Sequence, residues 1–403
     1  MRRIIPCVAV AVLAAGILKQ ATWALWLPPG ALPEEVGQYL AISRAGGAFD
    51  PGMERLAPKD LAELARFARL EAGHLPVKSA LDLRRLNAAL AGITTAVLVP
   101  AEVSSPPSSS YHSLLSRLLS RLLATDIRWR WVLMRLVGIA FLAFAAVLTY
   151  RALREGSAPH LAALAGMILV MYGPAAGMGA GLLGPSAFVA CLWGAWILCL
   201  TRMKSAWEAA PWAALVGLAM SSVDVQGGVA CAVTLAVVAA AGAPRQGLLP
   251  RITRWATIVL SVIGLVLWVF RLLTMQRAAP AAPWQGVLFA APSALLPVPV
   301  VLLVVWGAVG VVALAGLVIG LRGKKVPMAF AIGAAVLFSL LLGRIWPSPG
   351  MAALSTSPLM AYLIVQGCRE LWRQSVGWVA LAAVAVILDW AALLHWVLPR
   401  LFA

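Results

Sequence analysis

Residues 131–150 read WVLMRLVGIAFLAFAAVLTY, and this stretch decides the fold class. It contains a single charged residue, Arg135, in twenty positions. The hydrocarbon core of a bilayer is about 30 Å thick and needs about 20 apolar residues of α-helix to cross it. The stretch therefore predicts a transmembrane helix that carries one arginine.

The composition of the whole chain agrees with this prediction. Of the 403 residues, 62% are hydrophobic and 12% are charged, and the mean hydropathy is +0.91. A soluble domain of this size would carry roughly 25% charged residues. The composition excludes a water-soluble enzyme and favours an all-α integral membrane protein.

Apolar blocks of similar length recur along the chain and predict about eleven transmembrane helices. The weakest boundary is at Ser221–Asp224, where one long helix would give ten spans and two short helices give eleven. The predicted spans are residues 4–27, 131–150, 159–175, 184–201, 211–223, 226–242, 255–274, 297–320, 327–346, 355–368 and 376–398.

Three regions follow from these spans. Residues 1–27 form a first transmembrane helix, residues 28–130 an extracytoplasmic loop with interfacial helices, and residues 131–403 a polytopic transmembrane domain. The first region resembles a signal sequence, but its apolar part is long enough to span, so we expect an uncleaved anchor in which Lys19 snorkels. The alternative is cleavage after the Ala-Thr-Trp-Ala stretch that ends at Ala24.

The formal net charge of +17 reflects cations at the ends of the apolar blocks. This pattern is typical of membrane topology and of contact with anionic lipids, and we expect no nucleic acid partner. Basic residues at Arg151 with Arg154 and at Arg369 with Arg373 predict cytoplasmic ends. The N-terminus is then cytoplasmic and residues 28–130 are periplasmic, in a protein of the bacterial inner membrane.

Chemistry in water belongs to residues 28–130, which hold ten of the fifteen acidic residues. Glu34 and Glu35 follow the first span closely, and a carboxylate at the membrane surface can act as a general base. The alternative is structural, because Pro-Glu-Glu is a common helix opening. Leucines at helical spacing from Leu114 to Leu123 predict a helix that lies in the membrane interface.

The sequence lacks the regular ionisable residues at mid-membrane that mark proton relays and ion paths. Asp224, Asp389 and His395 are the main candidates, and we expect a structural or lipid-interface role for Asp389 and His395, which are not on one helix face. The five cysteines form no C-x-x-C pair, and the chain has no glycine-rich phosphate loop, G-x-S-x-G or H-E-x-x-H motif. Nucleotide hydrolysis is therefore not expected.

The order of first span, acidic pair, long outer loop, interfacial helix and polytopic remainder resembles the GT-C superfamily of membrane glycosyltransferases. Residues 106–115, PPSSSYHSLL, followed by the arginine of residues 131–136, WVLMRL, look like its juxtamembrane helix and second span. Residues 215–221, LVGLAMS, are similar to its middle spans. Residues 343–346, GRIW, with the later Ser-Pro-Leu at 357–359, look like its late arginine and proline segment.

This resemblance implies an inverting transfer of a sugar from a polyprenyl-phosphate donor to an extracytoplasmic lipid or glycan acceptor. Glu34 or Glu35 would be the general base. A divalent cation, Mg²⁺ or Mn²⁺, could assist at the carboxylates, although the sequence requires no metal. The expected substrate-binding residues are Arg344 with Arg135 or Arg271 for the phosphate, Tyr111 and His112 for the acceptor, and Asp50 for a further contact.

Two other classes of function stay open from the sequence. The usual acidic residue of the GT-C superfamily is an aspartate, and the chain has a Glu-Glu pair instead, so a non-catalytic GT-C-like subunit or scaffold is one alternative. A lipid or solute transporter is the other. A transporter predicts inverted repeats and polar residues spread over several spans, whereas the acidic residues here are concentrated in the outer loop.

Overall fold

The computed structural model describes residues 4–26, 111, 113–115, 127–173, 184–203, 207–240, 248–276, 333, 349–371 and 375–396. Within these ranges every regular element is a helix, so the all-α prediction is confirmed for the described part of the chain. The elements are α1 (Ile4–Trp26), α7 (Ile127–Glu155), α8 (His160–Met171), α10 (Ser186–Arg202), η1 (Trp207–Ala209), α11 (Ala210–Val223), α12 (Gln226–Ala240), α13 (Leu248–Gln276), α17 (Pro349–Leu371) and α18 (Ser375–Trp396).

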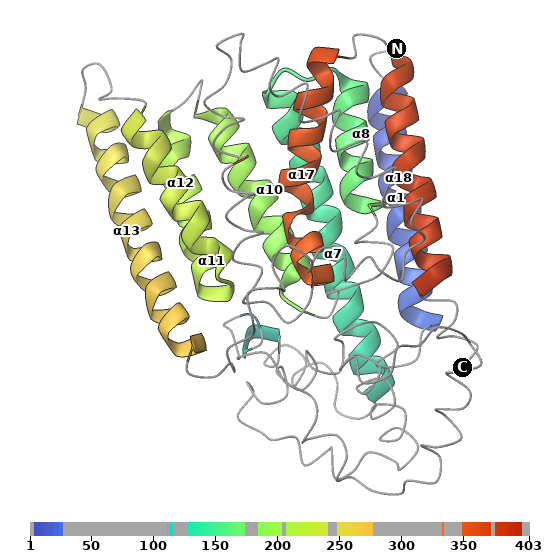
Figure 1. Cartoon of the computed structure of the whole chain (residues 1–403), viewed down its shortest axis with the longest axis horizontal. Helices are drawn as coiled ribbons and strands as arrows, with labels where there is room; N and C mark the ends of the chain where they lie inside the picture. Colours follow the sequence, from blue (N-terminus) through green and yellow to red (C-terminus); the bar gives the residue numbers. More distant parts are fainter. Residues whose placement is uncertain are drawn as a thin grey trace, which may run out of the picture.

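These helices form a bundle whose axes run in one general direction (Figure 1). Helix α10 lies between α7 and α17 on one side and α11 on the other, and α11, α12 and α13 pack against one another at the edge of the bundle. Helix α8 is the centre of the other half, because it contacts α1, α7, α17 and α18. The first and last helices thus lie close together although they are far apart in sequence.

Two helices are long and apolar enough to cross a membrane, namely Val132–Glu155 within α7 and Leu249–Leu273 within α13. They overlap two of the predicted spans, and they are consistent with association with a membrane. The predicted break near Ser221 is confirmed, because α11 ends at Val223 and α12 begins at Gln226. The predicted spans at 297–320 and, apart from residue 333, at 327–346 lie outside the described residues, so the number of eleven spans stays a prediction.

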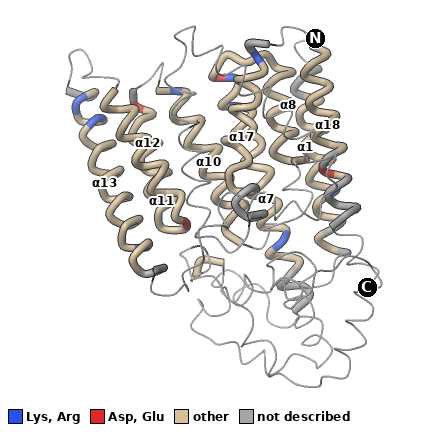
Figure 2. The backbone as a smooth tube through the Cα atoms, viewed as in Figure 1, with Lys and Arg blue, Asp and Glu red and all other residues tan. Residues whose placement is uncertain are grey.

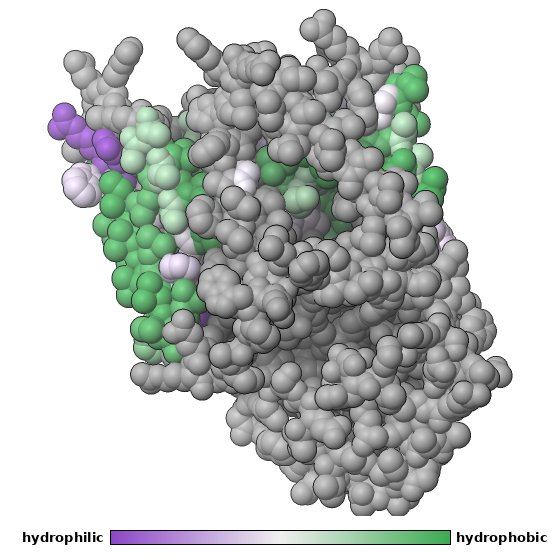
Figure 3. Space-filling model, in the orientation of Figure 1, coloured by the Kyte–Doolittle hydropathy of each residue, from purple (hydrophilic) through white to green (hydrophobic). Residues whose placement is uncertain are grey.

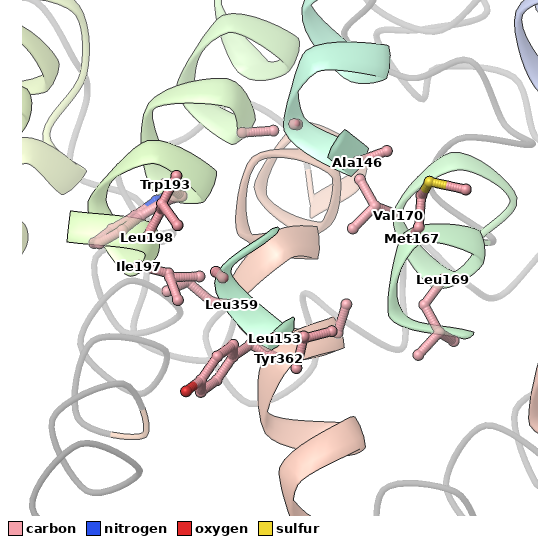
Figure 4. Packing of buried hydrophobic residues seen from close by; sticks show 14 of the residues in the cluster. Ala146, Leu153, Met167, Leu169, Val170, Trp193, Ile197, Leu198, Leu359 and Tyr362 are labelled. Carbon is pink, nitrogen blue, oxygen red and sulfur yellow. The ribbon is translucent and has the colours of Figure 1, made fainter. Parts of the chain in front are cut away.

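The core is a dense packing of apolar side chains from α7, α8, α10 and α17. Leu153, Met167, Trp193 and Leu359 are among its members, and Figure 4 shows side chains from these helices pointing toward one another. Helix α8 is apolar on all sides and nearly all of its residues are buried, as expected for a helix enclosed by neighbours. Exposed apolar side chains instead lie on α13 and along the outer faces of α1 and α18, where Figure 3 shows apolar surface at both edges of the bundle.

Helix α17 contains a proline in its interior and still continues for three further turns. Pro358 has no N–H to donate to the carbonyl of Leu354 four residues earlier. The hydroxyl of Ser357 donates to that carbonyl instead, at 2.7 Å. A side chain thus satisfies the backbone group that the proline leaves without its usual partner, which allows the helix to stay intact in apolar surroundings.

Lys and Arg positions, blue in Figure 2, gather at one end of the bundle. We call it the basic end, and its residues lie at or near the ends of α7, α10 and α17 and the start of α13: Arg151, Arg154, Arg202, Arg369, Arg251 and Arg254. Here Arg202 of α10 forms a salt bridge of 3.1 Å with Glu155 of α7, and Arg369 of α17 donates to the Gly156 carbonyl at 3.0 Å. Helix α1 starts at this end (Figure 1), and its C-terminus lies at the opposite end, which we call the far end.

Candidate functional site

Arg135 is completely buried in α7 and lies beside the last turn of α1. Its Nη1 atom donates a hydrogen bond to the carbonyl oxygen of Ala24 at 3.1 Å. Ala24 is two residues from the end of α1, so its carbonyl is one of the last four that lack a partner within the helix. A cation at this position also interacts favourably with the negative end of the helix dipole. The structure therefore places a predicted phosphate-binding arginine at the far end of α1.

Tyr111 packs against α7, the helix that carries Arg135. Its ring stacks on that of Phe188 of α10, with centroids 5.6 Å apart, and meets Phe141 of α7 edge-on at 6.5 Å. The residue is only 3% exposed. Burial raises the pKa of its hydroxyl above the ordinary value, so the phenol stays protonated. Because the ring is enclosed by α7 and α10, it is an anchor for the segment that precedes α7 and does not present an open face to an acceptor.

A buried ion pair lies about one and a half turns before Ala24 in α1, toward the basic end. The ammonium group of Lys19 forms a salt bridge and hydrogen bond with Asp389 Oδ2 of α18. The side chain of Asp389 is 0% exposed and that of Lys19 is 9% exposed. The expectation that Lys19 snorkels toward the membrane surface is wrong, because the ammonium finds a buried counter-ion across the bundle at lower cost than a long reach to water.

Aromatic rings and the end of α8 complete the surroundings of this pair. The Lys19 ammonium lies 5.4 Å from the ring centroid of Tyr172 and 5.8 Å from that of Trp390, so both rings act as cation–π partners. Tyr172 follows the last residue of α8, and its hydroxyl donates to the Val12 carbonyl of α1 at 3.0 Å. Three helices therefore meet at the pair.

Helix lengths explain why they meet there. Lys19 is fifteen residues into α1 and Asp389 is fourteen residues into α18, which places both about 20 Å from the basic end at 1.5 Å per residue. Helix α8 has only 12 residues and is about 18 Å long, so it stops at the same depth. Lys19 and Asp389 thus lie at about the level where α8 ends, and Arg135, twenty residues before Glu155 in α7, lies beyond it.

Arg271 belongs to a different group of helices. Its Nη1 atom donates to the Ser222 carbonyl at 2.8 Å, which brings α13 against the turn between α11 and α12. In this turn, Asp224 Oδ1 accepts the backbone N–H of Gln226 at 2.9 Å. Burial raises the pKa of Asp224 to about 6, while the Gln226 N–H and the charge of Arg271 act in the opposite direction. No contact between Arg271 and Arg135 is seen among the described residues.

The polar network continues from this turn into the core. Gln226 accepts a hydrogen bond from the Trp193 indole at 2.5 Å and donates to the Ser355 hydroxyl at 2.9 Å, which links α10, α12 and α17. All three side chains are buried. The network satisfies the amide of Gln226 on both sides, so its structural role is to fix the mutual register of three helices.

Glu34, Glu35, Asp50, His112 and Arg344 lie outside the described residues. Of the eight predicted site residues, the structure therefore describes Tyr111, Arg135 and Arg271, and it brings the first two to the same helix, α7. Asp224 lies in the turn between α11 and α12, whereas Asp389 and His395 both belong to α18. Among the described residues, no group of three or more His, Cys, Asp or Glu side chains could hold a metal ion. The predicted use of a divalent cation stays a prediction.

The pairing of Lys19 with Asp389 was not predicted from the sequence. The available signal was that each is an isolated charge in an otherwise apolar span, and such residues usually pair with one another. The buried hydrogen-bond network of Gln226 was not predicted either, because no sequence pattern distinguishes this residue.

Comparison with protein-family models, with curated proteins and with solved structures finds no match to this chain.

Proposed function

We propose that this chain is a multi-pass membrane glycosyltransferase that moves a sugar from a polyprenyl-phosphate donor to an extracytoplasmic lipid or glycan acceptor. The observation that carries the proposal is the hydrogen bond from buried Arg135 to the Ala24 carbonyl. Ten residues separate Ala24 from Glu34, a length of chain that reaches at most about 35 Å. In this proposal the phosphate-binding side chain is held at the end of α1, and the acidic pair follows a short distance along the chain.

The chemistry of such a site follows from the residue types. Glu34 or Glu35 removes the proton from an acceptor hydroxyl as its oxygen attacks the anomeric carbon of the sugar. The bond between that carbon and the phosphate oxygen breaks, and the polyprenyl phosphate leaves with the electron pair. A guanidinium matches a phosphate with two donors, and one of its five N–H groups can hold the α1 backbone at the same time.

The remaining parts of the proposal extend the same scheme. Arg344 and Arg271 are further candidates for the phosphate, with His112 and Asp50 as candidate substrate contacts, and Mg²⁺ or Mn²⁺ could assist at the carboxylates. The basic end faces the cytoplasm of a bacterial inner membrane in this scheme, because basic residues are retained on that side. Residues 28–130 then lie in the periplasm.

The test is a transfer assay with purified protein in lipid nanodiscs. A panel of polyprenyl-phosphate sugars is supplied, and release of polyprenyl phosphate is measured for the wild type, Glu34→Gln, Glu35→Gln and the double variant. We expect at least one single variant and the double variant to lose activity. The matched control is Glu155→Gln at the basic end, which removes an exposed carboxylate far from α1's last turn and should leave transfer unchanged.

A non-catalytic subunit is the interpretation that replaces this one if all four proteins bind the donor and none, the wild type included, transfers sugar. If the wild type transfers and every glutamate variant transfers equally well, the enzyme class stands and the assignment of the base is wrong. Both outcomes are separated from misfolding by size-exclusion profiles of the same samples.

One observation favours a transporter as the second candidate function. Buried charges such as Lys19 and Asp389 next to a helix that stops within the bundle are typical of transport sites near the membrane midplane. A flux assay in proteoliposomes tests this candidate. Uptake that depends on Asp389 without any sugar transfer would favour it over the glycosyltransferase.

A further inference from the structure

The first helix has the sequence of a signal peptide but the contacts of a core helix. It packs against α7 and α8, and three bonds to distant residues hold it along its length. These are the Tyr172 hydroxyl to the Val12 carbonyl, Lys19 to Asp389, and Arg135 to the Ala24 carbonyl. At Gly16 a Cβ atom would lie 2.6 Å from Cγ of Met171, so α1 approaches α8 as closely as glycine allows.

The Lys19–Asp389 ion pair holds α1 in the bundle in addition to its packing contacts with α7 and α8. Cleavage after Ala24 would remove Lys19 and leave the Asp389 carboxylate, which is 0% exposed in the intact bundle, without its counter-ion. Its second oxygen, Oδ1, already has no hydrogen-bond partner among the described residues, so Lys19 is the group that compensates the charge. Removing one partner of a buried pair is far more costly than never having the pair, because the other charge stays buried.

We propose that Lys19 and Asp389 are positioning residues that clamp α1 to α18, so that α1 is retained in the mature protein. The clamp fixes how deep α1 sits in the bundle, because Lys19 meets Asp389 at the level where α8 ends. It therefore also fixes where the chain leaves α1 and enters the segment with Glu34 and Glu35. This last consequence rests on the proposed function, whereas the clamp itself does not.

The proposal is tested first by the mass of the purified protein and by four variants. Intact mass should show residues 1–27 still attached. Lys19→Met and Asp389→Leu should each lower the yield of folded, monodisperse protein, the Lys19 change by at least about tenfold, because it leaves an uncompensated carboxylate. The double variant Lys19→Met with Asp389→Leu, and the swap Lys19→Asp with Asp389→Lys, should both recover most of the yield. Thr22→Met, an exposed position on the same helix, is the matched control and should behave as the wild type.

Activity then separates positioning from mere stability. Among the variants that fold, the uncharged double variant should show a lower kcat with an unchanged KM for the donor, and the swap should restore kcat. The proposal is overturned if the mature protein lacks Lys19, if both single variants fold as well as the wild type, or if neither double variant folds better than Lys19→Met. None of these three outcomes depends on sugar transfer, so failure of the proposed function would be seen separately.

Discussion

The guanidinium of Arg135 and the carbonyl of Ala24 are 111 residues apart in sequence and lie 3.1 Å apart in space. This hydrogen bond joins the third turn of α7 to the last turn of α1, two helices that are separated in the sequence by residues 27–126. The bond holds a buried guanidinium beside the last turn of α1, and the proposed phosphate contact depends on this guanidinium.

Substitution of Arg135 tests its role as a phosphate-binding residue. We expect Arg135→Lys to keep the charge but lower transfer by about a hundredfold, because an ammonium cannot replace two parallel donors. Arg135→Met should lower it further. The measurement is the initial rate at saturating and at limiting donor, with Arg151→Lys at the basic end as the control. If Arg135→Lys folds and transfers at the wild-type rate, the arginine acts only on the α1 backbone.

Tyr111 separates anchoring from acceptor binding. Because the ring is enclosed by Phe141 and Phe188, Tyr111→Ala should cost about 3 kcal/mol of stability. Tyr111→Phe keeps the ring and should retain both the melting temperature and the KM for the acceptor. Thermal unfolding followed by tryptophan fluorescence and acceptor titrations measure the two effects. A raised acceptor KM in a fully stable Tyr111→Phe protein would show that the hydroxyl contacts the acceptor after all.

The turn between α11 and α12 depends on Gly227. A Cβ atom there would lie 1.9 Å from the backbone nitrogen of Ser221, so Gly227→Ala forces the turn to open. We expect a loss of about 1–3 kcal/mol, typical of overpacking. The control is Ala232→Leu, which adds more bulk at an exposed position of α12 and should change the melting temperature little. Equal melting temperatures for wild type and Gly227→Ala would contradict the described packing.

Asp224 gives the protein a defined dependence on pH. Burial raises its pKa in the folded state from the ordinary 3.8 to about 6, so the folded protein holds a proton that the unfolded chain releases. The shift in the pKa of Asp224 contributes to the free energy of unfolding by up to about 3 kcal/mol. This contribution is fully present below about pH 4 and is lost as the pH rises through about 6.

The measurement is the melting temperature between pH 4 and 8 for the wild type and Asp224→Asn. The asparagine still accepts the Gln226 N–H but cannot ionise. Relative to this variant, the wild type should lose stability as the pH rises through 6. Parallel curves would mean that Asp224 is solvated in the folded protein.

The helical part of the fold was predictable because it follows from local composition. Residues 131–150 and 255–274 are apolar over the thickness of a bilayer, and α7 and α13 contain them. The break near Ser221 was predictable from charge, because Arg202 before it and Arg251 after it require a reversal of direction between them. Helix α8, at 12 residues, is shorter than its predicted span of 159–175, since hydropathy does not show where an apolar helix ends.

The contacts between helices were not predictable in the same way. Nothing local to Lys19 identifies Asp389 as its partner, because 370 residues separate them and the contact arises only when α1 and α18 pack on α8. Tyr111 has the residue type of a substrate contact, yet its burial depends on Phe188, 77 positions later in the chain. Whether a residue is an ion-pair partner, a buried anchor or a substrate contact depends on long-range packing, and the residue type alone does not show it.

The most direct test of the central claim is a cryo-electron microscopy structure of the protein in nanodiscs with polyprenyl phosphate bound. The claim is that the Glu34–Glu35 pair and an arginine share one chamber at the far end of α1. It predicts the lipid phosphate within about 3 Å of the Arg135 guanidinium, with a carboxylate of Glu34 or Glu35 facing the same chamber. A phosphate bound elsewhere, or both carboxylates projecting into bulk solvent, would contradict it.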